Sequence, residues 1–238
     1  MFFTTSVQPL PKITAPTAAE IAVNSKPSPQ GQALLKDGMT PPEYLHALEK
    51  NKLSVDSVHF LAHGLPEKDS ICWSAQGCRL VGPKLSAPEM NSLQLTEAWL
   101  KNPIPQLHAS IAASLQKVDF TGPGSWTGQA ALWAKIPGVP AAPPIPGFPS
   151  VALTAAAVAG AILLAFGLKI GVAMPAIPQP RLQLPNLPPT PELLLQLQKP
   201  KIPAIPQLPA LDQPKLMKPL LPFIDLGKRV ARGDVKCC

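Results

Sequence analysis

Two histidines followed by two cysteines are the residues in this sequence best suited to chemistry. His59 and His63 are four residues apart, so they share one face of a helix, and Cys72 and Cys78 follow on the next predicted helix. Imidazole and thiolate ligands suit zinc, but structural zinc modules space their cysteines about two to four residues apart. Here the spacing is six. We therefore expect no metal site, with His63 hydrogen-bonded near a helix end and Cys72 packed as a small core residue.

A pocket lined by His63 and Trp73 is the binding site that these residue types suggest. It belongs to an alternative in which the protein is an uncharacterised enzyme. The sequence contains no Gly-x-Ser-x-Gly elbow, phosphate-binding glycine loop or dinucleotide fingerprint. We therefore predict a protein that is not an enzyme and uses no cofactor.

The composition predicts an all-α protein. Of the 238 residues, 46% are hydrophobic, which suffices for a sizeable core, but 33 prolines and 15 glycines interrupt regular structure. Aromatic residues make up only 5% of the chain, and strand-forming residues are few. We expect an irregular multi-helix domain of short antiparallel helices joined by long proline-rich connections.

The charge distribution argues against a nucleic-acid-binding protein. The net charge is +7, yet residues 1–149 carry 11 Lys and Arg against 10 Asp and Glu, so the predicted folded half is almost neutral. Nucleic-acid-binding proteins concentrate basic side chains on one face of a folded domain. The N-terminal residues lack a charged stretch followed by an apolar one, which predicts a reducing, cytoplasmic location.

Capping and turn signals predict most of the helices. Thr40 and Glu43, and again Ser86 and Glu89, have the spacing of a capping box, in which each side chain binds the backbone of the other residue. The expected helices span 17–23, from 40 onward, 54–63, 66–81, from 86 until Pro103, 105–118, 125–135, 151–168 and 216–232. Pro219 and Pro222 should confine the last helix to its second half.

These elements divide the chain into six parts. We expect a flexible N-terminal arm, a helical domain, a proline-rich connector, an apolar helix, a proline-rich insertion, and a C-terminal helix with a basic tail. Their bounds are 1–30, 31–136, 137–149, 150–174, 175–214 and 215–238. The role of Cys237 and Cys238 stays open between a pair of exposed thiols and a doubly lipidated tail.

The apolar helix at Val151–Leu168 has two interpretations. It reaches the short end of the length needed to cross a bilayer, about 20 residues, before Lys169 interrupts it. Much of it is alanine, which contributes little transfer free energy, so a helix buried in the domain is the favoured interpretation. The alternative is a single span that anchors the protein in the inner membrane.

The proline-rich segment, residues 175–214, is unusually apolar for a solvated linker. Prolines every third or fourth residue favour polyproline II, and leucines and isoleucines lie between them. We expect this segment to contact a protein partner, which suggests an adaptor or scaffold. The predicted contact residues are Leu184, Leu187, Ile202, Ile205 and Leu208.

Several phrases together resemble an uncharacterised bacterial helical domain family of unknown function that is found near type VI secretion genes. They are Ala33-Leu34-Leu35, Gly38-Met39-Thr40-Pro41, Glu43-Tyr44-Leu45, Phe60-Leu61-Ala62-His63-Gly64-Leu65-Pro66, Trp73, and parts of 153–161 and 223–233. The resemblance implies one soluble helical domain that includes the apolar helix and the C-terminal helix, and a secretion-system component as partner. The proline-rich segment departs from that pattern, which has a short connection there.

Overall fold

The computed structural model describes residues 7–135, 150–172 and 213–235. Their regular structure is entirely helical, which confirms the all-α prediction. The α-helices are α1 (Ala18–Ser25), α2 (Pro29–Leu34), α3 (Pro41–Lys50), α4 (Ser54–Gly64), α5 (Glu67–Arg79), α6 (Ala87–Lys101), α7 (Pro105–Leu115), α8 (Pro123–Trp133), α9 (Ser150–Ile170) and α11 (Gln213–Arg232). A short 3₁₀ helix, η1 (Gly82–Lys84), follows α5.

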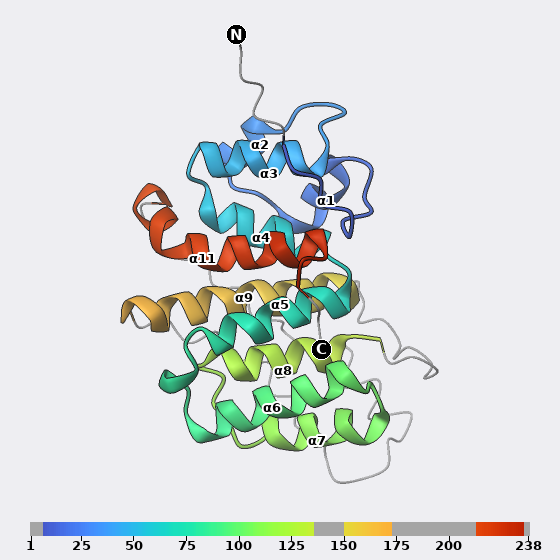
Figure 1. Ribbon diagram of the computed structural model, residues 1–238, viewed down its shortest axis with the longest axis vertical. Helices are drawn as coiled ribbons and strands as arrows, with labels where there is room; N and C mark the ends of the chain where they lie inside the picture. Colours follow the sequence, from blue (N-terminus) through green and yellow to red (C-terminus); the bar gives the residue numbers. More distant parts are fainter. Residues whose placement is uncertain (1–6, 136–149, 173–212, 236–238) are drawn as a thin grey trace, which may run out of the picture.

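Helix α9 lies in the middle of the molecule, with the other helices stacked above and below it (Figure 1). It packs against α4, α5, α8 and α11. Val158, Ile162 and Ala165 are fully buried in these contacts. At Gly77 the backbone of α5 comes so close that an added Cβ would lie 2.6 Å from Cδ1 of Ile162. A side chain at position 77 would force the end of the Ile162 side chain to move.

The burial of α9 bears on the two interpretations of the apolar segment. Ala152–Ile170 is long and apolar enough to cross a membrane, with a mean hydropathy of 2.0, and 78% of it is buried within the fold. Length and composition alone do not separate a span from a core helix. Burial against four other helices is the arrangement that the core-helix interpretation predicts.

The N-terminal segment is part of the core, so the prediction of a flexible arm over residues 1–30 is wrong for the described residues from 10 onward. Leu10, Ile13 and Ile21 are buried, and α1 packs on α4. Ser28 fastens the end of the segment, since its backbone N–H and its hydroxyl both donate to the carboxylate of Asp56, at 3.0 and 2.5 Å. The prolines that suggested a loose chain leave it extended, but its apolar side chains still find the surface of α4.

Of the two predicted capping boxes, the first is confirmed and the second is wrong. Thr40 donates from its backbone N–H and its hydroxyl to Oε2 of Glu43, at 2.8 and 2.7 Å, and these hydrogen bonds lower the pKa of Glu43. Ser86 does accept from the backbone N–H of Glu89, at 3.5 Å. The carboxylate of Glu89, however, binds the backbone N–H of Ser125 at 2.7 Å, at the start of α8.

The C-terminal helix contradicts the expectation that prolines shorten it. Helix α11 runs from Gln213 to Arg232 with Pro219 and Pro222 inside it. An interior proline costs a helix about 3 kcal/mol. Leu220 and Phe223 are fully buried against the rest of the protein, and this burial offsets the lost backbone hydrogen bonds.

Candidate functional site at the C-terminal helix

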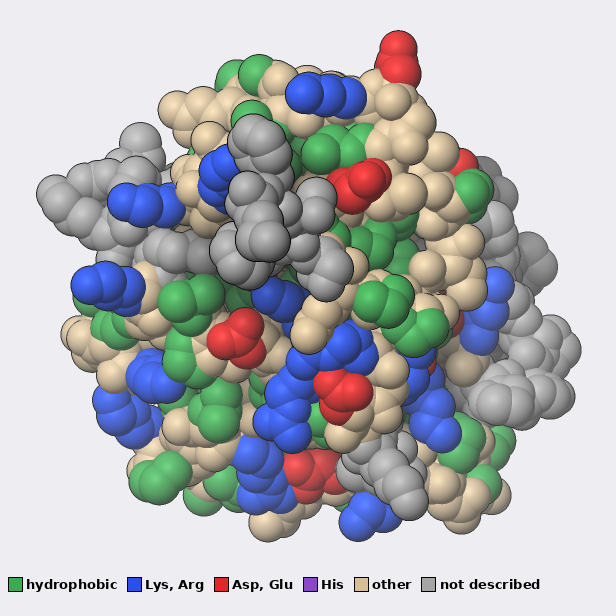
Figure 2. Space-filling model, turned by 45° about the horizontal axis from the view of Figure 1, so that its top comes forward, with side chains coloured by type: hydrophobic (Ala, Val, Ile, Leu, Met, Phe, Trp, Pro, Cys, Tyr) green, Lys and Arg blue, Asp and Glu red, His purple; other side chains and the backbone are tan. Residues whose placement is uncertain are grey.

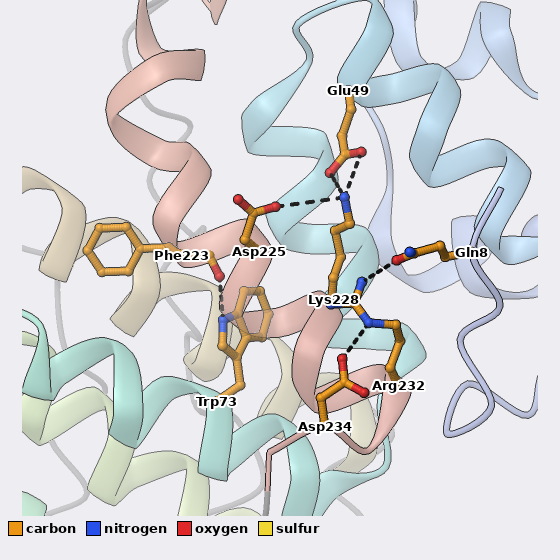
Figure 3. Close-up of polar contacts among 8 residues, drawn as sticks. All are labelled: Gln8, Glu49, Trp73, Phe223, Asp225, Lys228, Arg232 and Asp234. Carbon is orange, nitrogen blue, oxygen red and sulfur yellow. Dashed lines mark hydrogen bonds and ion pairs between the residues drawn. The ribbon is translucent and has the colours of Figure 1, made fainter. Parts of the chain in front are cut away.

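Helix α11 lies across α4, α5 and α9, far in sequence from all of them except α9. We call this contact region the α11 site. The side chains that α11 buries there are all apolar: Leu220, Phe223, Ile224, Val230 and Ala231. Figure 3 shows the polar contacts that surround this apolar stripe. An apolar stripe bordered by specific polar contacts is how a helix binds in a groove.

Trp73 of α5 lies at the centre of the α11 site (Figure 3). Its indole Nε1–H donates to the backbone carbonyl of Phe223, at 2.8 Å, and its side chain has 0% exposure. The ring lies directly beneath Gly227, where an added Cβ would be 2.7 Å from Cε2 of Trp73. Glycine at position 227 therefore allows α11 to approach the ring.

Charged side chains fix the direction and register of α11. The Lys228 ammonium donates to both carboxylate oxygens of Glu49 on α3, at 3.0 and 3.1 Å. Arg232 donates to the side-chain carbonyl of Gln8, at 2.9 Å, and to the Asp234 carboxylate, at 2.6 Å. These contacts tie the second half of α11 to the N-terminal segment and to α3.

Both helices that border the proline-rich segment are held at the same end of the molecule. In Figure 1 the end of α9 and the beginning of α11 lie at the left. The ammonium of Lys169 is 5.4 Å from the ring centre of Phe223, a cation–π contact between the two helices. Lys84 donates to the carbonyls of Leu168 and Lys169, at 2.6 and 3.2 Å, and so fixes the last turn of α9.

The predicted pocket between His63 and Trp73 is not open to solvent at Trp73. That indole is fully enclosed under α11, while His63 is half-buried on α4. A cavity of about 330 Å³ lies elsewhere, between the start of α6 and the turn after α7. It is lined by Ser86, Pro88, Glu89, Lys117, Val118 and Asp119.

The two histidines are held neutral. Burial lowers the pKa of His59, although the carboxylate of Asp56 opposes that effect. Burial also lowers the pKa of His63 to about 4, assisted by the nearby His59 and Lys26. Among the described residues, no group of three or more His, Cys, Asp or Glu side chains is placed to hold a metal ion.

The two cysteines of α5 differ in state. Cys78 is a free, buried thiol whose pKa burial raises to about 12, and its sulfur is 3.3 Å from the hydroxyl oxygen of Thr127. Cys72 is as deeply buried but takes part in a disulfide. The prediction that Cys72 is merely a small core residue therefore missed its chemistry.

Sequence reasoning also missed the place of Glu89. Its side chain is 5% exposed, and the residues around it at the start of α8 are Gly122 and Gly124, where an added Cβ would lie within 3 Å of it. Gly122 has no side chain to cap α8, so Glu89 of α6 supplies the carboxylate that this helix start favours. A helix that begins after a glycine without a capping residue is the signal that could have suggested a cap from elsewhere.

The fold and the α11 site together define an all-helical domain completed by a C-terminal helix. A model of a family of unknown function, DUF6931, matches residues 44–173, more than half of the chain, and the chain belongs to that family. The match covers the phrases at 60–66, at Trp73 and at 153–161, but not those at 33–43 and 223–233. Comparisons with curated proteins and with solved structures give no significant match.

Proposed function

We propose that this protein is a non-enzymatic adaptor or scaffold that presents its proline-rich segment to a protein partner. The observation that carries the proposal is that α9 and α11, which border the segment, pack directly against each other and share the core. Because α9 and α11 contact each other directly, the proline-rich segment is not needed to hold these two helices together. It is thereby available to a partner while both its ends stay fixed.

The predicted contact residues of the segment are spaced so that several of them can enter one binding groove of a partner. Leu184 and Leu187 are three residues apart, and so are Ile202, Ile205 and Leu208. Polyproline II repeats every three residues, so each set shares one edge of such a helix. All five residues lie outside the described part of the chain. A partner with an aromatic-lined groove suits this pattern.

The cellular setting is part of the proposal. We propose a cytoplasmic protein whose partner is a component of a type VI secretion system, the context that the resemblance implies. The charges on the described surface support a protein partner over a nucleic acid, because basic side chains at the centre of the face in Figure 2 lie directly beside acidic ones. The alternative, an accessory protein anchored in the inner membrane, draws on the length and hydropathy of α9.

The test compares partner capture by the wild-type protein and by a variant with all five predicted contact residues replaced by serine. A tagged protein is used to isolate partners from cells, and captured proteins are identified by mass spectrometry. We expect the variant to lose a partner that the wild type captures, and a synthetic peptide of residues 182–210 to compete for that partner. Equal capture by both proteins, with no competition by the peptide, would overturn the proposal.

The variant needs a control for folding and for general loss of apolar surface. A protein with Val23 and Leu80 replaced by serine serves, since both are exposed on the helical domain. It should capture the partner as well as the wild type does. Circular dichroism should show equal helix content in all three proteins.

A further inference from the structure

The cavity between the start of α6 and the turn after α7 carries an inference that is independent of the proposed function. Its volume is about 330 Å³, and its lining combines charged, hydroxyl and apolar groups. Small-molecule sites in proteins span about 300–1,000 Å³, so this cavity has room for a small ligand. The lining comes from two short stretches, 86–89 and 117–119, and both lie within the described residues.

Glu89 is the buried charged residue of this lining. It is 5% exposed, and its two carboxylate oxygens differ in their contacts. Oε2 accepts from the backbone N–H of Ser125, at 2.7 Å. Oε1 is enclosed and accepts no hydrogen bond from the described residues. A buried carboxylate oxygen without a donor is costly, because it has lost its contacts with water and gained none in return.

The surroundings of Glu89 show where a donor for Oε1 has to come from. An added Cβ at Gly122 or Gly124 would lie 2.7 or 2.9 Å from Oε2, and at neither position is Oε1 among the three nearest atoms. Oε2 therefore faces the start of α8, and Oε1 lies on the other side of the carboxylate. The cavity that Glu89 lines is the space from which a ligand can donate to Oε1.

The other polar groups of the lining suit a cation. Asp119 contributes a second carboxylate, and the hydroxyl and the backbone N–H of Thr121 lower its pKa by donating to it, so it is charged at neutral pH. Ser86 contributes a hydroxyl oxygen. Lys117 contributes an ammonium, but none of the ion pairs among the described residues involves it. Two carboxylates against one ammonium leave the lining negatively charged.

We propose that this cavity binds a small organic cation that carries a guanidinium group. A guanidinium has several N–H donors in one plane, so it can donate to Oε1 of Glu89 while its other N–H groups face the remaining acceptors of the cavity. Its charge compensates the buried carboxylate. Pro88 and Val118 supply apolar walls against which the aliphatic stem of such a molecule packs.

The lining fits a metal ion less well than a guanidinium. Among the described residues, no group of three or more His, Cys, Asp or Glu side chains is placed to hold a metal ion. A hard cation such as Ca²⁺ takes about six to eight oxygen ligands. The cavity offers two carboxylates and one hydroxyl, and one oxygen of Glu89 is already engaged by the start of α8.

The first test follows the amide NMR signals of the full chain as n-butylguanidinium is added. We expect the signals of 86–89 and 117–119 to shift and to saturate, with half-saturation at or below about 1 mM. N-butylurea has a similar shape without the charge, and tetramethylammonium has the charge without an N–H donor. Both should bind at least about tenfold more weakly. No saturable shift up to about 20 mM, or equal binding of N-butylurea, would overturn the proposal.

The second test compares the affinity of variants for n-butylguanidinium. Glu89→Gln keeps an oxygen for the N–H of Ser125 but loses the charge, so binding should weaken at least about tenfold. Asp119→Asn should weaken binding about two- to fivefold, and Lys117→Met should strengthen it about twofold or more, because a like charge is removed. Glu97→Gln is the matched control, since Glu97 lies on the same helix outside the cavity and pairs with Arg79. It should bind as the wild type does.

The variants at the rim keep the test decisive even where Glu89→Gln does not fold. Asp119 and Lys117 are exposed, so their replacement leaves the core intact. Circular dichroism checks the helix content of each variant. Unchanged affinity in both rim variants, or in a folded Glu89→Gln variant, would overturn the proposal. Displacement of the probe by Ca²⁺ would show that the cavity is a metal site and would equally overturn it.

Discussion

At the scale of single residues, the packing of α11 depends on the close approach of its backbone at Gly227 to the indole ring of Trp73. Gly227 faces the indole of Trp73, which is enclosed and hydrogen-bonded to the carbonyl of Phe223. The indole is rigid and has no space to move into. The packing of α11 on Trp73 therefore requires a residue without a side chain at position 227.

We predict that Gly227→Ala destabilises the protein by about 1–3 kcal/mol, since the new methyl group overpacks against Trp73 and outweighs the better helix propensity of alanine. Urea unfolding measures the change. Gly82→Ala is the matched control, because the nearest atom to its added Cβ is 3.8 Å away. A loss at Gly82 equal to that at Gly227 would show that the contact with Trp73 is not the cause.

Protonation of the two half-buried histidines of α4 is a second effect at this scale. The pKa of His63 is lowered to about 4, whereas an unfolded histidine titrates near its model value of 6.5. Between these values the unfolded state binds a proton that the folded state does not, so stability falls as the pH falls from about 6.5 to about 4. The lowered pKa of His59 acts in the same direction.

We therefore predict that the wild-type protein loses roughly 1–2 kcal/mol more stability between pH 7 and pH 5 than a His63→Gln variant does. Urea unfolding at the two pH values gives both differences. A His46→Gln variant is the control, since His46 lies on the exposed side of α3. Identical pH dependence of the wild type and the His63 variant would contradict the burial of a neutral imidazole.

At the scale of elements, the N-terminal helix tests whether the segment before α3 belongs to the core. Ile21 and Val23 lie on the same short helix, α1, with 4% and 73% exposure. We predict that Ile21→Ala costs about 2–4 kcal/mol and Val23→Ala less than about 0.5 kcal/mol. Thermal unfolding compares the two variants. Small and equal effects would mean that α1 contributes nothing to stability and that the flexible-arm prediction was correct after all.

Local signals in the sequence predict the helices, but they do not predict contacts between residues that are far apart in the sequence. Thr40 and Glu43 are three residues apart, so their capping box follows from the helix geometry alone. Glu89 and Ser125 are 36 residues apart, and Trp73 and Phe223 are 150 apart. Neither pairing can be inferred until α6 is known to meet α8, and α5 to meet α11. The candidate pocket failed for this reason, because α11 covers Trp73.

Burial also decides where composition misleads. The prolines before α1 and inside α11 predict irregular chain, yet Leu10, Ile13, Leu220 and Phe223 are buried. An apolar side chain stabilises the fold wherever it leaves water, whether or not the backbone around it is helical. Proline counts describe the backbone only, so they did not reveal that the segment before α1 and helix α11 are part of the core.

At the scale of the whole molecule, helix α9 and helix α11 pack against each other and so close the helical core. The family match ends at residue 173, two residues before the proline-rich segment. The described helices on either side of that segment pack together in one core. This closure is the central claim of the proposed function, since a segment that is not needed for folding is available for binding.

The most direct test replaces residues 175–212 with a flexible Gly-Ser linker of about 12 residues and measures thermal unfolding by circular dichroism. We predict the helix content expected for the remaining residues, a cooperative transition, and a Tm within a few degrees of the wild type. Loss of the cooperative transition, or a Tm lower by about 10 °C or more, would contradict the account. The proline-rich segment would then be part of the helical core and not a surface held ready for a partner.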